Sequence, residues 1–298
     1  MNKIVLISGP TGIGKTNLST KICDEFNGRL ISCDSMQIYK DMNIGTNKIS
    51  EKDQKKYPHA LIDIVYPNEE FSVSMYKDLA TKEIEKTFKD NKLPIIVGGT
   101  GLYMRAVLFP YSFNNSTKND ALRTYYEKLI EEKGKEYVFN ILKEKNAEIA
   151  SKLHPNDTKR VIRKLEMLSV KNLSTDAEES EYDYELIVLN EDREKLYNKI
   201  NNRVEQMFSE GLIEEVKNII KKYNLTRESQ SMQAIGYKEF FDYFDNKIDL
   251  NTLKELIKQH TRNYAKRQIT WFKTMPKAVW FDVKDTEKII AYLKSKLV

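Results

Sequence analysis

Short apolar runs alternate with amphipathic stretches over roughly the first 110 residues of the chain. Runs typical of buried strands occupy residues 4–7, 30–33 and 93–97, and residues 59–64 could form another short strand. Between them, apolar residues recur at helical spacing, first at Leu18, Ile22 and Phe26 and later at Met75, Leu79, Ile84 and Phe88. This alternation predicts an α/β fold in which helices cover both faces of a parallel sheet.

The pattern changes in the middle of the chain. Residues 114–183 carry highly charged helical patterns and end in an acidic stretch, 174–183, that we interpret as a linker. Strand patterns return at 185–189 and 278–283, and a terminal helix follows. We therefore predict a core formed by 1–113 and 184–298, with 114–183 as an inserted, mainly helical subdomain.

Composition adds a few limits. Net charge is only +5 although 31% of the residues are charged, so the total alone does not indicate a nucleic-acid partner. The two cysteines, Cys23 and Cys33, show no metal-ligand spacing, which favours a reducing, cytoplasmic location. The sequence shows neither an apolar run long enough to span a membrane nor a signal-peptide pattern, so we expect no membrane association.

The first apolar run leads into a phosphate-binding motif. Its G-x-x-x-x-G-K-T pattern lies between a strand and a helix, as a P-loop requires. Backbone N–H groups and the helix N-terminus would hold a di- or triphosphate, the lysine would add a full charge, and the threonine hydroxyl would bind Mg²⁺. The predicted diphosphate site is Gly9, Pro10, Thr11, Gly12, Ile13, Gly14, Lys15 and Thr16, with Thr16 as the metal ligand.

Three more residues are candidates for chemistry. Asp34 follows the second strand, where it could hold Mg²⁺, act as a general base, or simply form a turn or helix cap. Thr100 follows Gly98-Gly99, where the simplest interpretation is a helix N-cap. Arg203 lies in a helical segment and could clamp a diphosphate or be solvated. Since ligands of parallel sheets bind beyond the carboxyl ends of the strands, the P-loop, Asp34 and Thr100 should converge on one crevice.

Two basic clusters suggest an RNA partner. One comprises Lys159, Arg160, Arg163 and Lys164 and follows a helix-start signal. The other, 258–277, contains six cations and no acid, interleaved with Tyr264, Trp271 and Phe272. Cations mixed with stacking surfaces are typical of RNA recognition, although a solvated helix face would show the same charges.

Taken together, these motifs resemble those of the bacterial tRNA dimethylallyltransferase family, the tRNA isopentenyltransferases. The resemblance follows the family's order through nearly the whole chain. It is carried by the P-loop and by residues 31–39, 44–46, 59–63, 97–103, 154–157, 233–237 and 265–272. The most specific elements are Asp34-Ser35-Met36-Gln37-Ile38-Tyr39, Gly98-Gly99-Thr100 and Lys266-Arg267-Gln268-Ile269-Thr270-Trp271.

The resemblance implies transfer of a dimethylallyl group from dimethylallyl diphosphate to N6 of the adenosine 3′ to the anticodon, in tRNAs that read codons beginning with U. It implies Asp34 as general base, Thr100 at the reacting centre and Arg203 on the diphosphate. We expect a monomer that binds the tRNA anticodon stem-loop. The resemblance and the basic stretch together predict tRNA contacts at Asp34, Ser35, Met36, Gln37, Thr100, Arg123, Lys159, Arg160, Val161, Ile162, Arg163, Arg262, Lys266, Arg267 and Trp271.

Three other functions fit part of the pattern. An ATP-dependent kinase would explain the P-loop but not the acid-free stretch at 258–277. A transferase acting on a free adenosine phosphate would need neither basic cluster nor a helical insertion. A nucleotide-driven RNA-binding switch protein would need no base at Asp34.

Overall fold

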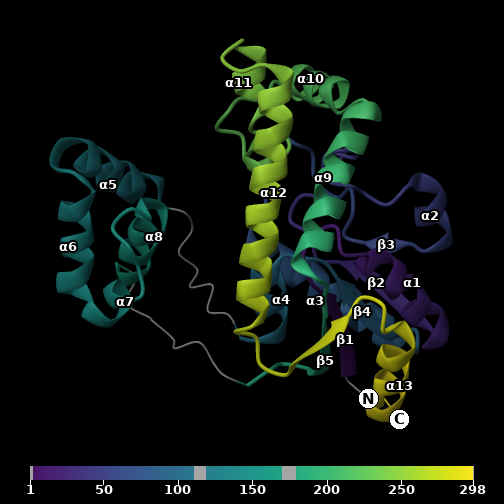
Figure 1. The fold of residues 1–298 in the computed structure, drawn as a ribbon. Coiled ribbons are helices and arrows are strands. Elements are labelled where there is room, and N and C mark those ends of the chain that lie inside the picture. The colour runs from purple at the N-terminus through teal and green to yellow at the C-terminus, as the bar shows by residue number, and fades with distance from the viewer. Residues whose placement is uncertain (1–2, 111–118, 170–178, 298) are drawn as a thin grey trace. The chain divides into compact units, whose positions relative to one another are not determined.

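The computed structural model describes residues 3–110, 119–169 and 179–297. These form two compact units, one made of residues 1–109 and 180–298 and the other of 110–179 (Figure 1). The first unit is therefore discontinuous in sequence. Half of the predicted acidic linker, 174–178, lies outside the described residues.

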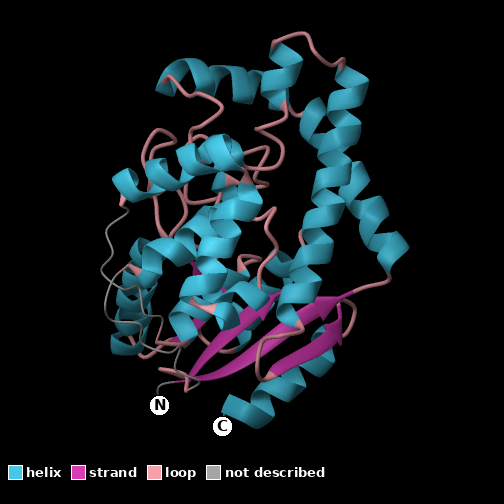
Figure 2. Ribbon diagram, turned by 90° about the vertical axis from the view of Figure 1, so that its left-hand side faces the viewer, coloured by secondary structure: helices cyan, strands magenta, loops and turns pink. Residues whose placement is uncertain are grey.

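A six-stranded parallel sheet forms the centre of the first unit, which confirms the predicted α/β fold (Figure 2). The strand order is β3-β2-β4-β1-β5-β6, so β1 lies in the interior of the sheet. The strands are β1 Lys3–Ser8, β2 Gly28–Ser32, β3 His59–Ala60, β4 Leu93–Val97, β5 Asp183–Asn190 and β6 Ala278–Asp282. Since β2, β4 and β1 are neighbours, the loops that follow these three strands meet at one edge.

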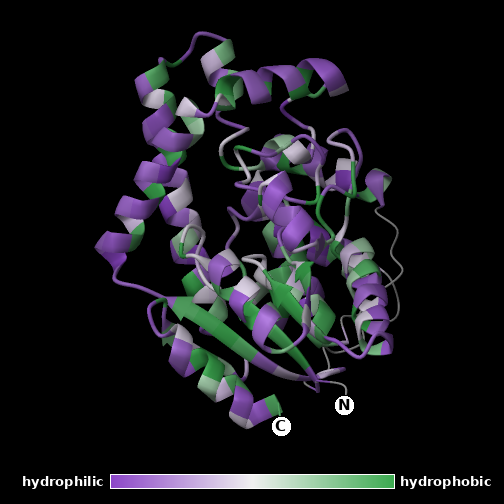
Figure 3. Cartoon of the chain, turned by 90° about the vertical axis from the view of Figure 1, so that its right-hand side faces the viewer, coloured by the Kyte–Doolittle hydropathy of each residue, from purple (hydrophilic) through white to green (hydrophobic). Residues whose placement is uncertain are grey.

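Helices of the first unit bury both faces of the sheet. Alternate residues of β1 belong to different apolar cores, Ile4 and Leu6 to one and Val5 and Ile7 to the other. Accordingly, the strands are hydrophobic along most of their length (Figure 3). The helices are α1 Lys15–Glu25, α2 Glu51–Lys56, α3 Val73–Lys89, α4 Gly101–Leu108, α9 Arg193–Ser209, α10 Leu212–Tyr223, the 3₁₀ helix Ser231–Gln233, α11 Phe240–Phe244, α12 Leu250–Phe272 and α13 Thr286–Leu297.

The second unit is helical and has an apolar core of its own, which includes Val138, Leu142 and Leu165. Its helices are α5 Asp120–Lys133, α6 Lys135–Lys145, α7 Ala147–Ser151 and α8 Thr158–Leu168. None of the helices that the structure describes, in either unit, is both long enough and apolar enough to cross a membrane.

Two local expectations are corrected. The third strand covers only His59–Ala60 rather than 59–64, because Leu61 and Asp63 take left-handed φ angles of 66° and 56° and end the extended backbone. Helix α3 buries Tyr76, Ala80, Ile84 and Thr87, whereas Met75 is 46% exposed. The face of α3 that packs against the core is therefore rotated about the helix axis from the face that Met75, Leu79, Ile84 and Phe88 predicted.

Candidate active site

The P-loop connects β1 to α1, and its glycines have the backbone that the motif requires. Gly9, Gly12 and Gly14 take φ angles of 138°, 80° and 101°, which side chains strongly disfavour. Gly9 also approaches the backbone of Leu189 so closely that a Cβ would lie 2.7 Å from its carbonyl oxygen. The loop thereby places the N-terminus of α1, with its partial positive charge, at the carboxyl end of the sheet.

Lys15 supplies a partly buried cation to this loop. Its Nζ donates hydrogen bonds of 2.9 Å to the carbonyls of Gly9 and Pro10. Burial lowers the pKa of Lys15 to about 8, against the opposing effect of Asp34 and with the help of Arg203. The ammonium is therefore mostly charged at neutral pH. Ile13 serves a different purpose, since its side chain is in the core and only its backbone is available to a ligand.

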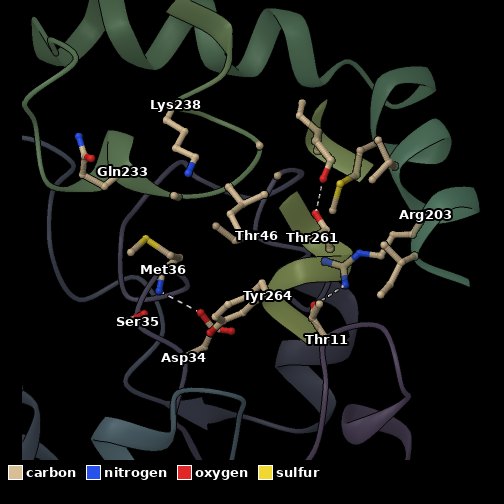
Figure 4. Close-up of a pocket in the computed structure, with 18 of the residues that line it drawn as sticks. Thr11, Asp34, Ser35, Met36, Thr46, Arg203, Gln233, Lys238, Thr261 and Tyr264 are labelled. Atoms are coloured by element: carbon tan, nitrogen blue, oxygen red, sulfur yellow. Dashed lines mark hydrogen bonds between the residues drawn. The ribbon is translucent and has the colours of Figure 1, made fainter. Parts of the chain in front are cut away.

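Asp34 lies in a turn directly after β2. Its Oδ1 accepts hydrogen bonds from the backbone N–H groups of Met36 at 2.9 Å and Gln37 at 3.3 Å. The turn that the sequence suggested is thus present, but it uses only Oδ1, and the residue also lines a cavity. The carboxylate is therefore oriented by its own loop toward the space where a ligand would bind (Figure 4).

Thr100 lies at the N-cap position of α4, yet its hydroxyl makes no capping bond. Instead Oγ1 accepts a 3.0 Å hydrogen bond from the backbone N–H of Ser35. Thr100 is therefore at the helix N-cap position, as predicted, but its hydroxyl does not cap the helix. Thr100 holds the loop after β2 against the loop after β4, and with it the carboxylate of Asp34.

Arg203 extends from α9 to the P-loop, where Nη1 donates a 3.3 Å hydrogen bond to Thr11 Oγ1 (Figure 4). Its Nε is buried and has no hydrogen-bond partner. Burial lowers the pKa of Arg203 to about 10, although the charges of Asp34 and Glu210 oppose the shift. A partly buried guanidinium with an unused, buried donor beside a P-loop is the arrangement expected of an anion-binding site.

Of the side chains described so far, those of Asp34, Thr11 and Arg203 border a cavity of about 290 Å³, whereas Lys15 and Thr100 are not among its lining residues. Asp34, Thr11 and Arg203 lie at one part of it, and apolar side chains from α9, α12 and the 233–236 segment line another. Figure 4 shows Lys238, Thr261 and Tyr264 directed to the same space, residues that the sequence analysis did not assign to the site. The lining residues are Thr11, Asp34, Ser35, Met36, Gly45, Thr46, Ile200, Arg203, Val204, Met207, Gln233, Ala234, Ile235, Gly236, Lys238, Ile257, Thr261, Tyr264 and Arg267.

Tyr264 was missed because it was counted with the stacking residues of the basic stretch. Burial raises the pKa of Tyr264, as does the nearby charge of Asp34, whereas a hydrogen bond with Thr100 lowers it. The net effect is upward, so the phenol stays protonated at neutral pH. It provides a polar group beside both Asp34 and Thr100.

The predicted RNA-contacting residues of the first unit lie in different settings. Ser35, Met36 and Arg267 line the cavity, whereas Lys266 is exposed on α12. Gln37 Nε2 donates to the carbonyls of Thr46 and Asn47 at 3.2 and 3.3 Å, and Arg262 Nη1 donates to Asn201 Oδ1 at 2.6 Å. Trp271 packs against Gly101, and its indole Nε1 is buried without a partner.

In the second unit, Arg123 and Arg163 pair with one buried carboxylate, Glu166, at 2.9 and 2.6 Å. Arg160 pairs with Asp157 at 3.4 Å, and Lys159 is exposed. Val161 and Ile162, two of the predicted contacts, are in the core of the unit at 1% and 5% exposure. Their side chains are therefore not available to an RNA.

At the P-loop, a magnesium ion would need phosphate oxygens of a bound substrate among its ligands, because the protein supplies few of its own. Thr16, the predicted metal ligand, is exposed at the start of α1. Among the described residues there is no group of three acidic, histidine or cysteine side chains that could hold a metal. Mg²⁺ bound through one hydroxyl, waters and substrate phosphates needs no such group, so the residues present are compatible with it.

Known proteins resemble this chain over its whole length. The IPP transferase family model matches residues 37–275. A tRNA dimethylallyltransferase of Bacillus anthracis is 44% identical over 99% of this chain and 96% of its own length. The corresponding protein of Bacillus cereus (strain 03BB102) is also 44% identical, over 99% and 95%.

Solved structures show the same likeness. The full-length tRNA isopentenylpyrophosphate transferase of Bacillus halodurans superimposes with a TM-score of 0.76 at 38% identity, covering 100% of this chain and 97% of that one. A eukaryotic dimethylallyltransferase acting on tRNA gives 0.80 at 28% identity, covering 100% of this chain and 78% of that one.

Proposed function

This chain belongs to the IPP transferase family, and on that premise we propose that it transfers the dimethylallyl group of dimethylallyl diphosphate to N6 of an adenosine in tRNA. We propose the adenosine 3′ to the anticodon, in tRNAs that read codons beginning with U, as the acceptor. The observation that carries the proposal is the incompletely bonded guanidinium of Arg203, whose Nε is buried without a partner and whose Nη1 contacts Thr11 of the P-loop, at a cavity that Asp34 also lines.

The leaving group determines one half of the site. Breaking the allylic C–O bond releases a diphosphate, and this step is easier when developing negative charge meets preorganised donors. Lys15, the P-loop N–H groups and Arg203 would supply those donors. When bound through Thr16 and the phosphates, Mg²⁺ would add further charge neutralisation. The apolar side chains of α9 and α12 would surround the dimethylallyl tail.

The acceptor determines the other half. The N6 amine of adenine is a weak nucleophile because its lone pair is delocalised into the ring. As the C–N bond forms, Asp34 would accept the proton that N6 loses, an effect usually worth about 10²–10⁴-fold in rate. Thr100 would hold the reacting amine through its hydroxyl and, with Ser35, would keep Asp34 in place. The adenosine has to leave its stack to reach this depth.

RNA contacts belong to the same proposal. Lys266 and Arg267 of α12 and the exposed Lys159 and Arg160 of α8 would bind phosphates of the anticodon stem-loop. Because its substrate is tRNA, we place the activity in the cytoplasm. We propose a monomeric enzyme, which size-exclusion chromatography with light scattering tests directly.

Mass spectrometry of nucleosides tests the reaction itself. Unmodified tRNA is incubated with the protein, Mg²⁺ and either dimethylallyl diphosphate or ATP. We expect adenosine to gain the dimethylallyl mass only with the allylic donor, and Asp34→Asn to lower the rate by about 10²-fold or more while tRNA still binds. Phosphate release from ATP without any gain on tRNA would favour the kinase instead.

A further inference from the structure

A buried amide connects the two loops that the proposed reaction brings together. Gln268 of α12 is 5% exposed. Its Oε1 accepts a 2.9 Å hydrogen bond from the backbone N–H of Thr11 in the P-loop. Its Nε2 donates a 2.9 Å hydrogen bond to the carbonyl of Gly99, next to Thr100. The two partners belong to loops that follow β1 and β4.

An amide side chain of this length satisfies both partners. Thr11 offers a donor and Gly99 an acceptor, so the bridging group has to accept at one end and donate at the other. A glutamate could accept from Thr11 but would face the Gly99 carbonyl with a second acceptor. Methionine has nearly the same length and would make neither bond. The arrangement therefore depends on hydrogen bonding as well as on packing.

Gly99 in the loop after β4, and Gly101 at the start of α4, leave room for α12. A Cβ at Gly99 would lie 2.1 Å from Gln268 Nε2, while its next neighbours would be 3.4 and 3.7 Å away. A Cβ at Gly101 would lie 2.2 Å from the ring of Trp271. The loop that carries Thr100 is thus in direct contact with α12 on both sides of the threonine.

We propose that Gln268 is a positioning residue, which sets the P-loop and the Thr100 loop at the separation that the transfer requires. The inference rests on the proposed function. In that reaction the P-loop holds the allylic diphosphate, and Thr100 and Asp34 hold the amine that attacks it. Reacting atoms have to approach to about 3–3.5 Å, and a displacement of about 1 Å reduces rates by about 10²-fold. Gln268 also makes this separation depend on α12, the helix that carries Arg267 and Tyr264.

The first test compares Gln268→Met with Gln259→Met, a matched change at an exposed position of the same helix. For Gln268→Met we expect a 10–10²-fold loss of kcat with both substrates saturating, and KM values for donor and tRNA within about threefold of wild type. Faster amide hydrogen exchange at Thr11 should accompany the loss. Gln259→Met should behave as wild type. A Gln268→Met protein with wild-type kcat overturns the inference, as does one whose loss is explained by its unfolded fraction.

The second test addresses the same contact from the other side. Gly99→Ala should displace the amide and reproduce the loss of kcat. Because Gln268→Ala removes the atom that the new methyl group would meet, the double variant should be no worse than Gln268→Ala alone. Losses that multiply would show two independent effects and overturn the proposal. Wild-type protein that transfers no dimethylallyl group would overturn the proposed function first, whereas an active wild type with normal variants would overturn this inference alone.

Discussion

The two basic helices, α8 and α12, look alike in sequence but use their cations differently. In the second unit, Arg163 of α8 and Arg123 of α5 share the carboxylate of Glu166, which is only 1% exposed. Burial raises the pKa of Glu166, but hydrogen bonds from Asn119, Arg123 and Arg163 outweigh this effect and lower it. These arginines therefore stabilise the unit, whatever else they contact.

On α12 the cations that pair with carboxylates and those that do not lie at different positions along the helix. Lys258 is neutralised by Glu205 and Glu255 at 2.6 and 2.7 Å. Further along, Lys266 and Arg267 are exposed and have no acidic partner within 4.0 Å among the described residues. A count of charges thus overstates the cations available to RNA, and the structure separates those held by carboxylates from those that are not.

The largest expected effect comes from removing the shared carboxylate of the second unit. Glu166→Ala leaves two guanidinium groups and the N–H of Asn119 without their acceptor. Because both arginines are about a third exposed, we expect the low end of the range for broken buried pairs, about 2–3 kcal/mol less free energy of unfolding. Amide hydrogen exchange of residues 119–169 measures this loss of unfolding free energy.

Glu205→Ala is the matched control, since Glu205 also binds two cations, Lys254 and Lys258, but is 46% exposed. We expect a change of at most about 1 kcal/mol. Equal effects of the two substitutions would show that the buried carboxylate has no special structural role.

A smaller effect distinguishes the cations along α12. Lys266→Ala combined with Arg267→Ala should weaken tRNA binding by about 10–10²-fold near 0.1 M salt and reduce the slope of log K against log salt by about 1–2. Lys258→Ala should change affinity by less than about twofold, because its charge is already paired. Fluorescence anisotropy over a range of salt concentrations measures both. A Lys258 variant as weak as the double variant would contradict the comparison.

The smallest effect belongs to the P-loop and involves neither basic helix. The pKa of Lys15 is lowered to about 8, so its charge is lost as pH rises through that value. If diphosphate binds at the proposed site, it favours the charged form of Lys15, and its apparent Kd should therefore increase about tenfold between pH 7 and pH 9. Isothermal titration with inorganic pyrophosphate measures the change. In Lys15→Arg, the part of this pH dependence that comes from Lys15 should disappear, and only the part that comes from ionisation of pyrophosphate should remain. If the variant shows the same pH dependence of Kd as wild type, Lys15 is not the cause.

Sequence was sufficient where local patterns determine the structure. The strand at 93–97 was predicted with its exact bounds, because an apolar β-branched run ends in Gly98-Gly99. The P-loop and its following helix were also predicted correctly in position. The left-handed residues Leu61 and Asp63 were not predicted. Leucine rarely takes this conformation, and an aspartate takes it too seldom for its position in the sequence to mark the end of a strand.

Long-range contacts account for most of what the sequence did not reveal. Gln268 lies 257 residues from Thr11 along the chain, and no spacing rule relates them. Likewise, Gly98-Gly99-Thr100 suggested a strand end and a cap, whereas the structure relates Gly99 and Gly101 to the packing of α12. Which arginines would pair with Glu166 was equally invisible, because the partners come from two different helices.

The discontinuous core has a consequence for how the protein is made. Strand β1 pairs with β5 over Lys3–Ser8 and Asp183–Val188, so its final neighbour leaves the ribosome only after the second unit has been synthesised. Residues 110–179 have their own core and local contacts, which favours folding during translation. The sheet, in contrast, is completed by β6 near the end of the chain. Because Gln268, Tyr264 and Arg267 also belong to this late segment, a nascent chain has no complete site until almost all of it has emerged.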